Sequence, residues 1–147
     1  MLYYLYNFDY SDFVNEQDAS PPIVFNVYVH ALADRLSIPA LEKLAVSKFS
    51  ARAKAEFKTP EFAAAVHEIY TNTADRKHEL RTVCLDVCTT YAKVMHDEDW
   101  GAGLREVLTT IPAIGAEICA KLAKGAQSTG NAGKWYLCPN CGGSFHE

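Results

Sequence analysis

The chain has 147 residues, of which 49% are hydrophobic and 22% are charged, and this composition is typical of a soluble globular protein with a sizeable core. Its net charge of −4 arises before residue 21, where the only charges are Asp9, Asp12, Glu16 and Asp18. No basic stripe follows, so a nucleic-acid partner is not predicted. No apolar run approaches the ~18 residues of a membrane span, so a membrane protein is not predicted either.

Cysteine usage indicates the compartment. The five cysteines are an odd number and form no disulfide framework. The opening MLYYLYNFDY is apolar, but it lacks the basic leader and the small-residue cleavage site of a signal peptide. We therefore expect an intracellular protein, in the cytoplasm or the nucleus.

The chain has helical periodicity, which is clearest in a hairpin at residues 23–49. Apolar residues recur at helical spacing in both arms: Phe25, Val29, Leu32 and Leu36 in the first, and Leu41, Leu44, Ala45 and Phe49 in the second. A short link at residues 37–39 forces the two helices to lie side by side and bury these faces together. The first residues resemble the end of a helix, and residues 7–22 are predicted to form an acidic loop.

Two further helices are predicted after the hairpin. Thr59-Pro60-Glu61 is typical of a helix start, because it offers a capping hydroxyl and a proline at the first helical position. This helix should end near residues 71–73. A longer helix is expected to begin at residue 74 or 75 and to run to about residue 96, with Cys84 and Cys88 on or beside its apolar face.

The last helical patterns lie between Asp99 and Gly125. Asp99 is a candidate cap for a helix that carries Leu104, Val107, Leu108 and Ile111. Pro112 interrupts or restarts the pattern, which continues at every fourth residue. A stop is predicted at Gly125, since glycine favours the position just past a helix end.

Residues 125–134, GAQSTGNAGK, are small, polar and rich in glycine, as in a flexible linker. The predicted fold class is all-α, a helical bundle or hairpin array with a flexible Cys-x-x-Cys tail. Four segments are expected: a first helical part at 1–58, a following helical region at 59–124, the linker at 125–134, and the tail at 135–147.

The tail carries the most specific motif of the chain, CPNCGG at residues 138–143. Cys138 and Cys141 have the spacing of one half of a zinc knuckle, and His146 is a candidate third ligand. Structural zinc takes four ligands, and a fourth is not evident in the sequence. Three interpretations stay open: zinc held within one chain, zinc shared between chains, and a tail without metal.

No catalytic constellation is found. His30, His67, His78 and His96 have no metal-pair spacing, and we interpret them as residues on the surface of helices or partly buried. Cys84 and Cys88 are interpreted as small apolar residues on a helix face. The carboxylates at 97–99 suit a helix start. No nucleophile elbow or phosphate loop is present, so we predict that the chain is not an enzyme.

Two stretches resemble the closing part of a BTB/POZ domain of the type abundant in filamentous fungi. MLYYLYNFDY is similar to the family's mLxYLYtxdY, and VYVHALADRLSIPALEKLAVSKF is similar to vyxlAdkyxixxLkxlA. Residues 62–81 also resemble the segment vyxxtpxxdrxLR that opens the next helix in that family. The resemblance covers about residues 1–95 and continues less closely to residue 124.

The resemblance implies a BTB-like adaptor or scaffold that binds proteins, by self-association or by docking on a cullin-type ubiquitin ligase. It also implies that the N-terminal half of the domain, with much of the dimer face, lies outside these residues, as in a fragment or a shortened gene model. The alternative hypothesis is a zinc-binding module with a transcription-related role through Cys138, Cys141 and His146.

Overall fold

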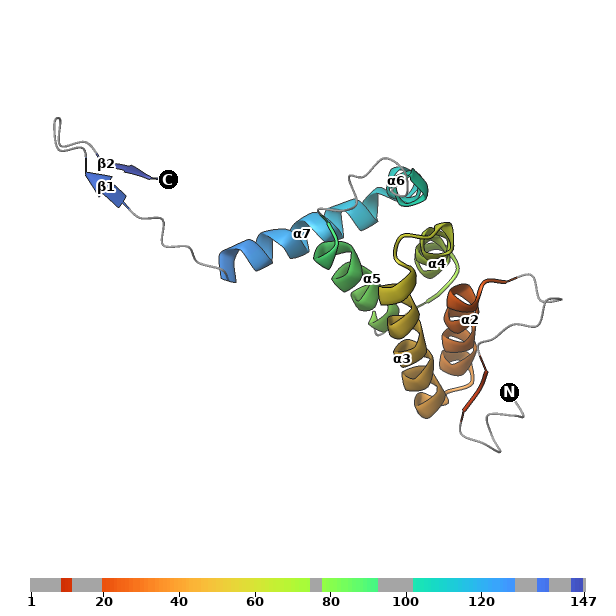
Figure 1. Cartoon of the computed structure of the whole chain (residues 1–147). Helices are drawn as coiled ribbons and strands as arrows, with labels where there is room; N and C mark the ends of the chain where they lie inside the picture. Colours follow the sequence, from red (N-terminus) through yellow and green to blue (C-terminus); the bar gives the residue numbers. More distant parts are fainter. Residues whose placement is uncertain are drawn as a thin grey trace.

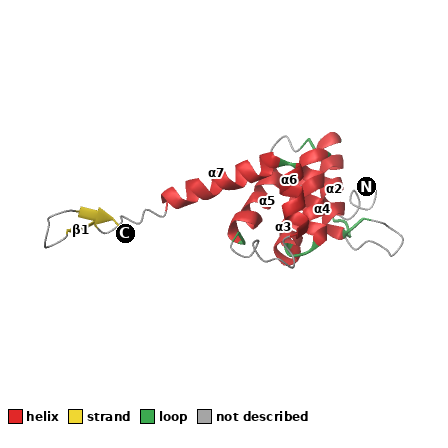
Figure 2. Ribbon diagram, turned by 90° about the horizontal axis from the view of Figure 1, so that it is seen from above, coloured by secondary structure: helices red, strands yellow, loops and turns green. Residues whose placement is uncertain are grey.

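The computed structural model describes residues 9–11, 20–74, 78–92, 102–128, 135–137 and 144–146. The predicted all-α fold is confirmed in these ranges, which contain α2 (Pro22–Arg35), α3 (Pro39–Glu56), α4 (Pro60–Thr71), α5 (Glu79–Thr90), α6 (Ala102–Thr110) and α7 (Pro112–Ser128). Two short strands follow, β1 (Trp135–Leu137) and β2 (Ser144–His146). Helices α2 to α6 form a bundle, and α7 extends away from it (Figures 1 and 2).

Four of the six described helices begin at a proline: Pro22, Pro39, Pro60 and Pro112. Proline suits the first helical position, because its φ angle is already helical and its missing N–H would have no partner there. The predicted cap of α4 is wrong in one respect. Thr59 occupies the cap position, but its hydroxyl makes no capping bond and is buried without a partner among the described residues.

The predicted hairpin is confirmed as α2 and α3. The turn between them contains Ser37, whose φ of 54° lies in the left-handed region. The N–H of Ile38 donates to the carbonyl of Ala33 at 2.9 Å, and the N–H of Ser37 donates to that of Asp34 at 3.1 Å. These bonds satisfy carbonyls that the helix end leaves free, which makes the reversal tight.

The predicted apolar face of α2 is buried only in part, against the smaller of two core clusters. Ile23 and Val27 are fully buried in the larger core cluster, whereas Phe25 and Val29 are only partly buried against a second, smaller one. Leu36, which ends the predicted stripe, is 44% exposed. The helix lies between two apolar clusters, so both of its sides are covered.

Helix α4 is the centre of the bundle, because it contacts α2, α3, α5 and α6. Its buried side chains alternate in size: Phe62, Ala63, Ala65, Val66 and Ile69. The alanines allow neighbouring helices to approach closely, and the larger side chains fill the core between them. A Cβ on Gly103 of α6 would meet Ala63 at 3.4 Å, which shows how near α6 comes.

Tyr10 anchors a segment that the sequence assigned to an acidic loop. Its side chain is 9% exposed and belongs to the smaller cluster, edge-on to Phe25. The phenol donates a hydrogen bond to the amide oxygen of Asn26 on α2. Lys48 of α3 lies over the ring, donates to the carbonyl of Tyr10, and forms an ion pair with Asp9 at 2.8 Å. The described residues 9–11 are thus fixed to both arms of the hairpin.

The later helices are placed as predicted, but their ends differ. Helix α5 begins at Glu79, after residues 75–77, which lie outside the described residues together with 93–101 and hence with Asp99. Helix α7 continues through Gly125 to Ser128, so the first part of the predicted linker is helical. A glycine ends a helix when the chain reverses at that residue. Helix α7 is continuous and shows no such reversal (Figure 1).

Two polar contacts hold α7 to the bundle. The phenol of Tyr70 on α4 donates to the Glu117 carboxylate at 2.6 Å, and the guanidinium of Arg81 lies 4.8 Å from the centre of the Tyr70 ring. One turn further along α7, Lys121 pairs with Asp86 of α5 at 2.6 Å. Both contacts lie beyond Ile114, the one residue of α7 that is fully buried among the described side chains.

We expect Tyr70→Phe to reduce the loss of stability at high pH. Burial, and then the hydrogen bond and charge of Glu117, raise the pKa of Tyr70 above its ordinary value of 10.0. A raised folded-state pKa means that the stabilisation is complete below about pH 10 and is lost as the pH rises from there toward the folded value. The free energy of unfolding, measured in urea between about pH 9 and 11, should fall less steeply in Tyr70→Phe than in the wild type.

Glu117→Gln is the companion variant, because it removes the charge and keeps a hydrogen-bond acceptor. Its pH dependence should lie between those of the wild type and Tyr70→Phe. Identical slopes in all three proteins would contradict a role for the Tyr70 phenol.

Candidate functional site

The predicted metal ligands lie at the C-terminal hairpin, where only His146 falls within the described residues. Strands β1 and β2 are antiparallel, with Trp135 opposite His146. The segment between them holds Cys138 and Cys141 and lies outside the described residues. At about 3.3 Å per residue, the backbone of His146 is about 7 Å along the strand from Ser144, where the connection ends. Because two of the three predicted ligands lie outside the described residues, the set stays a prediction.

The described side chains offer no other metal site, since no group of three or more His, Cys, Asp or Glu residues in those ranges could hold an ion. Cys84 and Cys88 are buried on α5, which agrees with their interpretation as apolar side chains. Burial raises the pKa of the Cys88 thiol to about 12, so it stays protonated at neutral pH and is a poor ligand or nucleophile. Cys119 of α7 is exposed.

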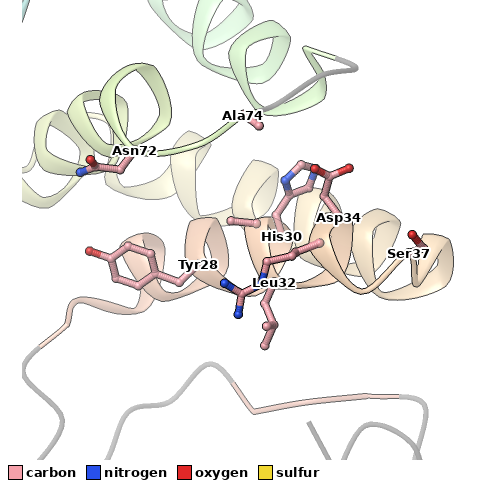
Figure 3. A pocket seen from close by; sticks show the side chains of 9 residues that line it. Tyr28, His30, Leu32, Asp34, Ser37, Asn72 and Ala74 are labelled. Atoms are coloured by element: carbon pink, nitrogen blue, oxygen red, sulfur yellow. The ribbon is translucent and has the colours of Figure 1, made fainter.

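A groove of about 600 Å³ lies between α2 and the segment that follows α4. Its polar lining consists of Tyr28, His30, Asp34 and Arg35 of α2, Ser37 of the turn, and Asn72 beyond α4. Figure 3 shows His30 and Asp34 on the side of α2 that faces the segment carrying Ala74. Because these two residues are four apart on one helix, both point to the same side.

His30 is the buried polar group of this groove. It is 4% exposed, and neither ring nitrogen has a hydrogen-bond partner among the described residues. The carboxylate of Glu79, the first residue of α5, lies with Oε2 3.7 Å from His30 Nε2, and this oxygen is also buried without a partner. A buried polar group without a hydrogen bond costs about 1–3 kcal/mol. The groove therefore contains polar atoms that a ligand could satisfy.

Tyr28 stands at the edge of the groove and is 42% exposed. Partial burial, and then the nearby Glu68 carboxylate of α4, raise the pKa of Tyr28. A phenol thus borders the groove beside His30. No local sequence pattern connects His30 to Glu79, because the two lie 49 positions apart in the chain.

The other candidate surface is the free end of α7. Ile114 is 1% exposed, Ile118 packs against the core, and Leu122 is 43% exposed. These residues are spaced by four, so they form one apolar stripe that runs from the core into solvent. Alanines and Cys119 accompany Leu122 on the exposed part of the helix.

In the described ranges, no helix combines the length and the apolar character that crossing a bilayer requires. Comparison of the chain with protein-family models, with curated proteins and with solved structures finds no match.

Proposed function

We propose that this chain is a non-enzymatic protein–protein interaction module, an adaptor or scaffold of the BTB-like kind. The apolar stripe of α7 is the observation that carries the proposal. The face that buries Ile114 continues to Leu122, which is 43% exposed, on a helix that extends away from the bundle (Figure 1). An apolar helix face that leaves its own core is suited to a groove or helix of another protein.

The partner that we propose for this face is a second copy of the chain. The BTB family that the chain resembles self-associates largely through its N-terminal half, so a contact through α7 would be a separate one. A two-fold contact would use the same stripe on both copies. The exposed residues beside Leu122 include Ala120 and Ala123, which would let two α7 helices approach closely. A cullin-type ubiquitin ligase scaffold is the second partner that the resemblance suggests.

Sedimentation velocity of the full chain from about 1 to 200 µM tests self-association. We expect a small contact between two helices to have a Kd in the micromolar range. We expect a concentration-dependent dimer, and Leu122→Glu should remain a monomer throughout. Leu36→Glu is the matched control, because Leu36 is 44% exposed but lies at the end of α2. A wild-type chain that stays monomeric, or equal effects of both variants, would contradict the proposal. Adding a purified cullin scaffold to the same sedimentation experiment tests the second proposed partner.

A zinc-binding module with a transcription-related role is the alternative function, and the β1–β2 hairpin favours it. Two antiparallel strands bracket the segment that contains Cys138 and Cys141. A reversing connection between paired strands is a suitable place for two thiolates to converge on one ion. Zinc held within one chain and zinc shared between two chains, each giving two thiolates, are both compatible with this hairpin.

Elemental analysis of the purified full chain tests the zinc hypothesis. A shared site predicts about one zinc per two chains, and a site within one chain predicts about one per chain. Cys138→Ser should abolish binding in either case. Cys119→Ser, which alters an exposed cysteine on α7, should leave the zinc content unchanged. Zinc-free protein, or equal zinc content in both variants, would eliminate this function.

A further inference from the structure

We propose that the groove on α2 receives a basic side chain, the guanidinium of an arginine or the ammonium of a lysine, from a partner protein. This assignment deepens the proposed interaction function and rests on it. The groove lies on α2 and the segment after α4, whereas the self-association stripe lies on α7. The groove is therefore a contact surface separate from the α7 stripe, with polar instead of apolar chemistry.

The unpaired atoms in the groove require a hydrogen-bond donor. Neutral imidazole has one donor and one acceptor nitrogen, and a carboxylate only accepts. If His30 Nε2 donates to Glu79 after a small movement, Nδ1 remains as an acceptor without a partner. If Nδ1 carries the proton instead, Nε2 and Glu79 Oε2 are two facing acceptors. In the second case the Nδ1–H also lacks an acceptor, but in both tautomers at least one acceptor lacks a donor, which a guanidinium or ammonium group can supply.

The charge of the surroundings selects a cation. Asp34 lines the groove, and the Glu79 carboxylate lies 3.7 Å from the His30 ring, which also lines it. Arg35 is the one basic residue of the described lining, and it is exposed. Two carboxylates, at and beside the lining, against one exposed guanidinium favour a positive group over an anion.

The size of the groove and the ring at its edge also suit a long basic side chain. A cavity of about 600 Å³ holds far more than the one or two waters that would pair the buried atoms, since water occupies about 30 Å³ in the liquid. The half-exposed ring of Tyr28 offers an aromatic face over which a guanidinium can pack. The apolar side chains of Ala31 and Leu32, which also line the groove, can contact the methylene stem.

Titration of the full chain with N-acetyl-arginine amide and N-acetyl-lysine amide, followed by the His30 ring resonances in NMR, tests the assignment. We expect saturable shifts with a Kd on the order of millimolar, as for a single side chain. N-acetyl-citrulline amide has nearly the same shape without the charge and should produce no saturable shift. His30→Gln identifies the resonances by their absence.

Two charge-neutral variants of the groove sharpen the test. Glu79→Gln and Asp34→Asn should each weaken binding of the arginine probe about tenfold. Asp86→Asn is the matched control, because Asp86 is exposed on α5 and pairs with Lys121 away from the groove. It should leave the affinity unchanged in a protein with an unaltered amide spectrum.

Equal shifts with the citrulline probe, no saturable shift with either cation, or equal effects of Glu79→Gln and Asp86→Asn would overturn the assignment. The sedimentation result for Leu122→Glu is independent of these outcomes. A negative NMR titration would therefore overturn only the assignment of the groove. A negative sedimentation result would contradict the proposed self-association independently of the groove.

Discussion

Phe62→Ala is expected to lower the free energy of unfolding by about 3–5 kcal/mol, as is usual when a fully buried aromatic side chain is removed. Phe62 is 0% exposed and lies in the first turn of α4, the helix that contacts α2, α3, α5 and α6. A cavity at this position cannot be filled by a single neighbour moving inward. Since a domain of this size is stabilised by about 5–15 kcal/mol, much of the folded population could be lost. Urea unfolding followed by far-UV circular dichroism measures the change.

Phe57→Ala is the control, because it removes the same type of side chain at a partly buried position. Phe57 lies just after α3, is partly buried, and stacks on Tyr91 with 3.8 Å between the ring centres. Losing this contact should cost about 1–2 kcal/mol, because the side chain gives up a smaller buried area and one aromatic pair. A cost at Phe57 that equals the cost at Phe62 would contradict the central position of α4.

Asn26→Ala should have the second-largest effect, a loss of about 2–3 kcal/mol. Asn26 is fully buried, accepts the hydrogen bond of Tyr10, and donates its own amide proton to the carbonyl of Pro22 at 3.1 Å. Removing the amide leaves the buried phenol without this acceptor and opens a small cavity. The same urea titration measures the loss.

A double-mutant cycle isolates the contact between Tyr10 and Asn26. Tyr10→Phe alone should cost about 1 kcal/mol, and the double variant Tyr10→Phe, Asn26→Ala should cost less than the sum of the single changes. Additive effects would show that the two side chains are not coupled. In that case the described residues 9–11 would be held to the hairpin by Lys48 and the Tyr10 ring instead.

Helix starts were the most predictable part of the fold, because they depend on neighbours in the sequence. Thr59-Pro60-Glu61 predicts the beginning of α4, whereas Pro112 predicts either an interruption or a new start, and α7 begins at this proline. Helix ends were less predictable. Gly125 is a residue that often follows the last turn of a helix, yet α7 continues through it. Glycine permits the chain to turn but does not require it to do so.

The buried face of α2 could not be predicted, for a physical reason. Periodicity identifies an apolar stripe only when the opposite side of the helix faces water. In α2, Val27 faces one cluster and Ala33 the other, so nearly every turn contributes to burial. The choice of Phe25 and Val29 as the main stripe followed the pattern and missed that the deeper cluster lies on the other side.

The groove could not be predicted either, because its polar atoms come from helices far apart in the sequence. His30 carries no local signal, and Glu79 resembles any acidic residue at a helix start. The metal ligands are predicted from spacing alone, and Cys138 and Cys141 lie outside the described residues.

The burial gradient along α7 has a consequence for hydrogen exchange. Amide protons near Ile114 lie in the core and should exchange only when the whole bundle unfolds. Amide protons after Lys121, beyond the last contact with α5, should exchange by fraying of the helix end. Along one continuous helix, protection should therefore fall from the core toward the free end. Binding of a partner at the free end of α7 should slow amide hydrogen exchange in its last turns and leave exchange in the core unchanged.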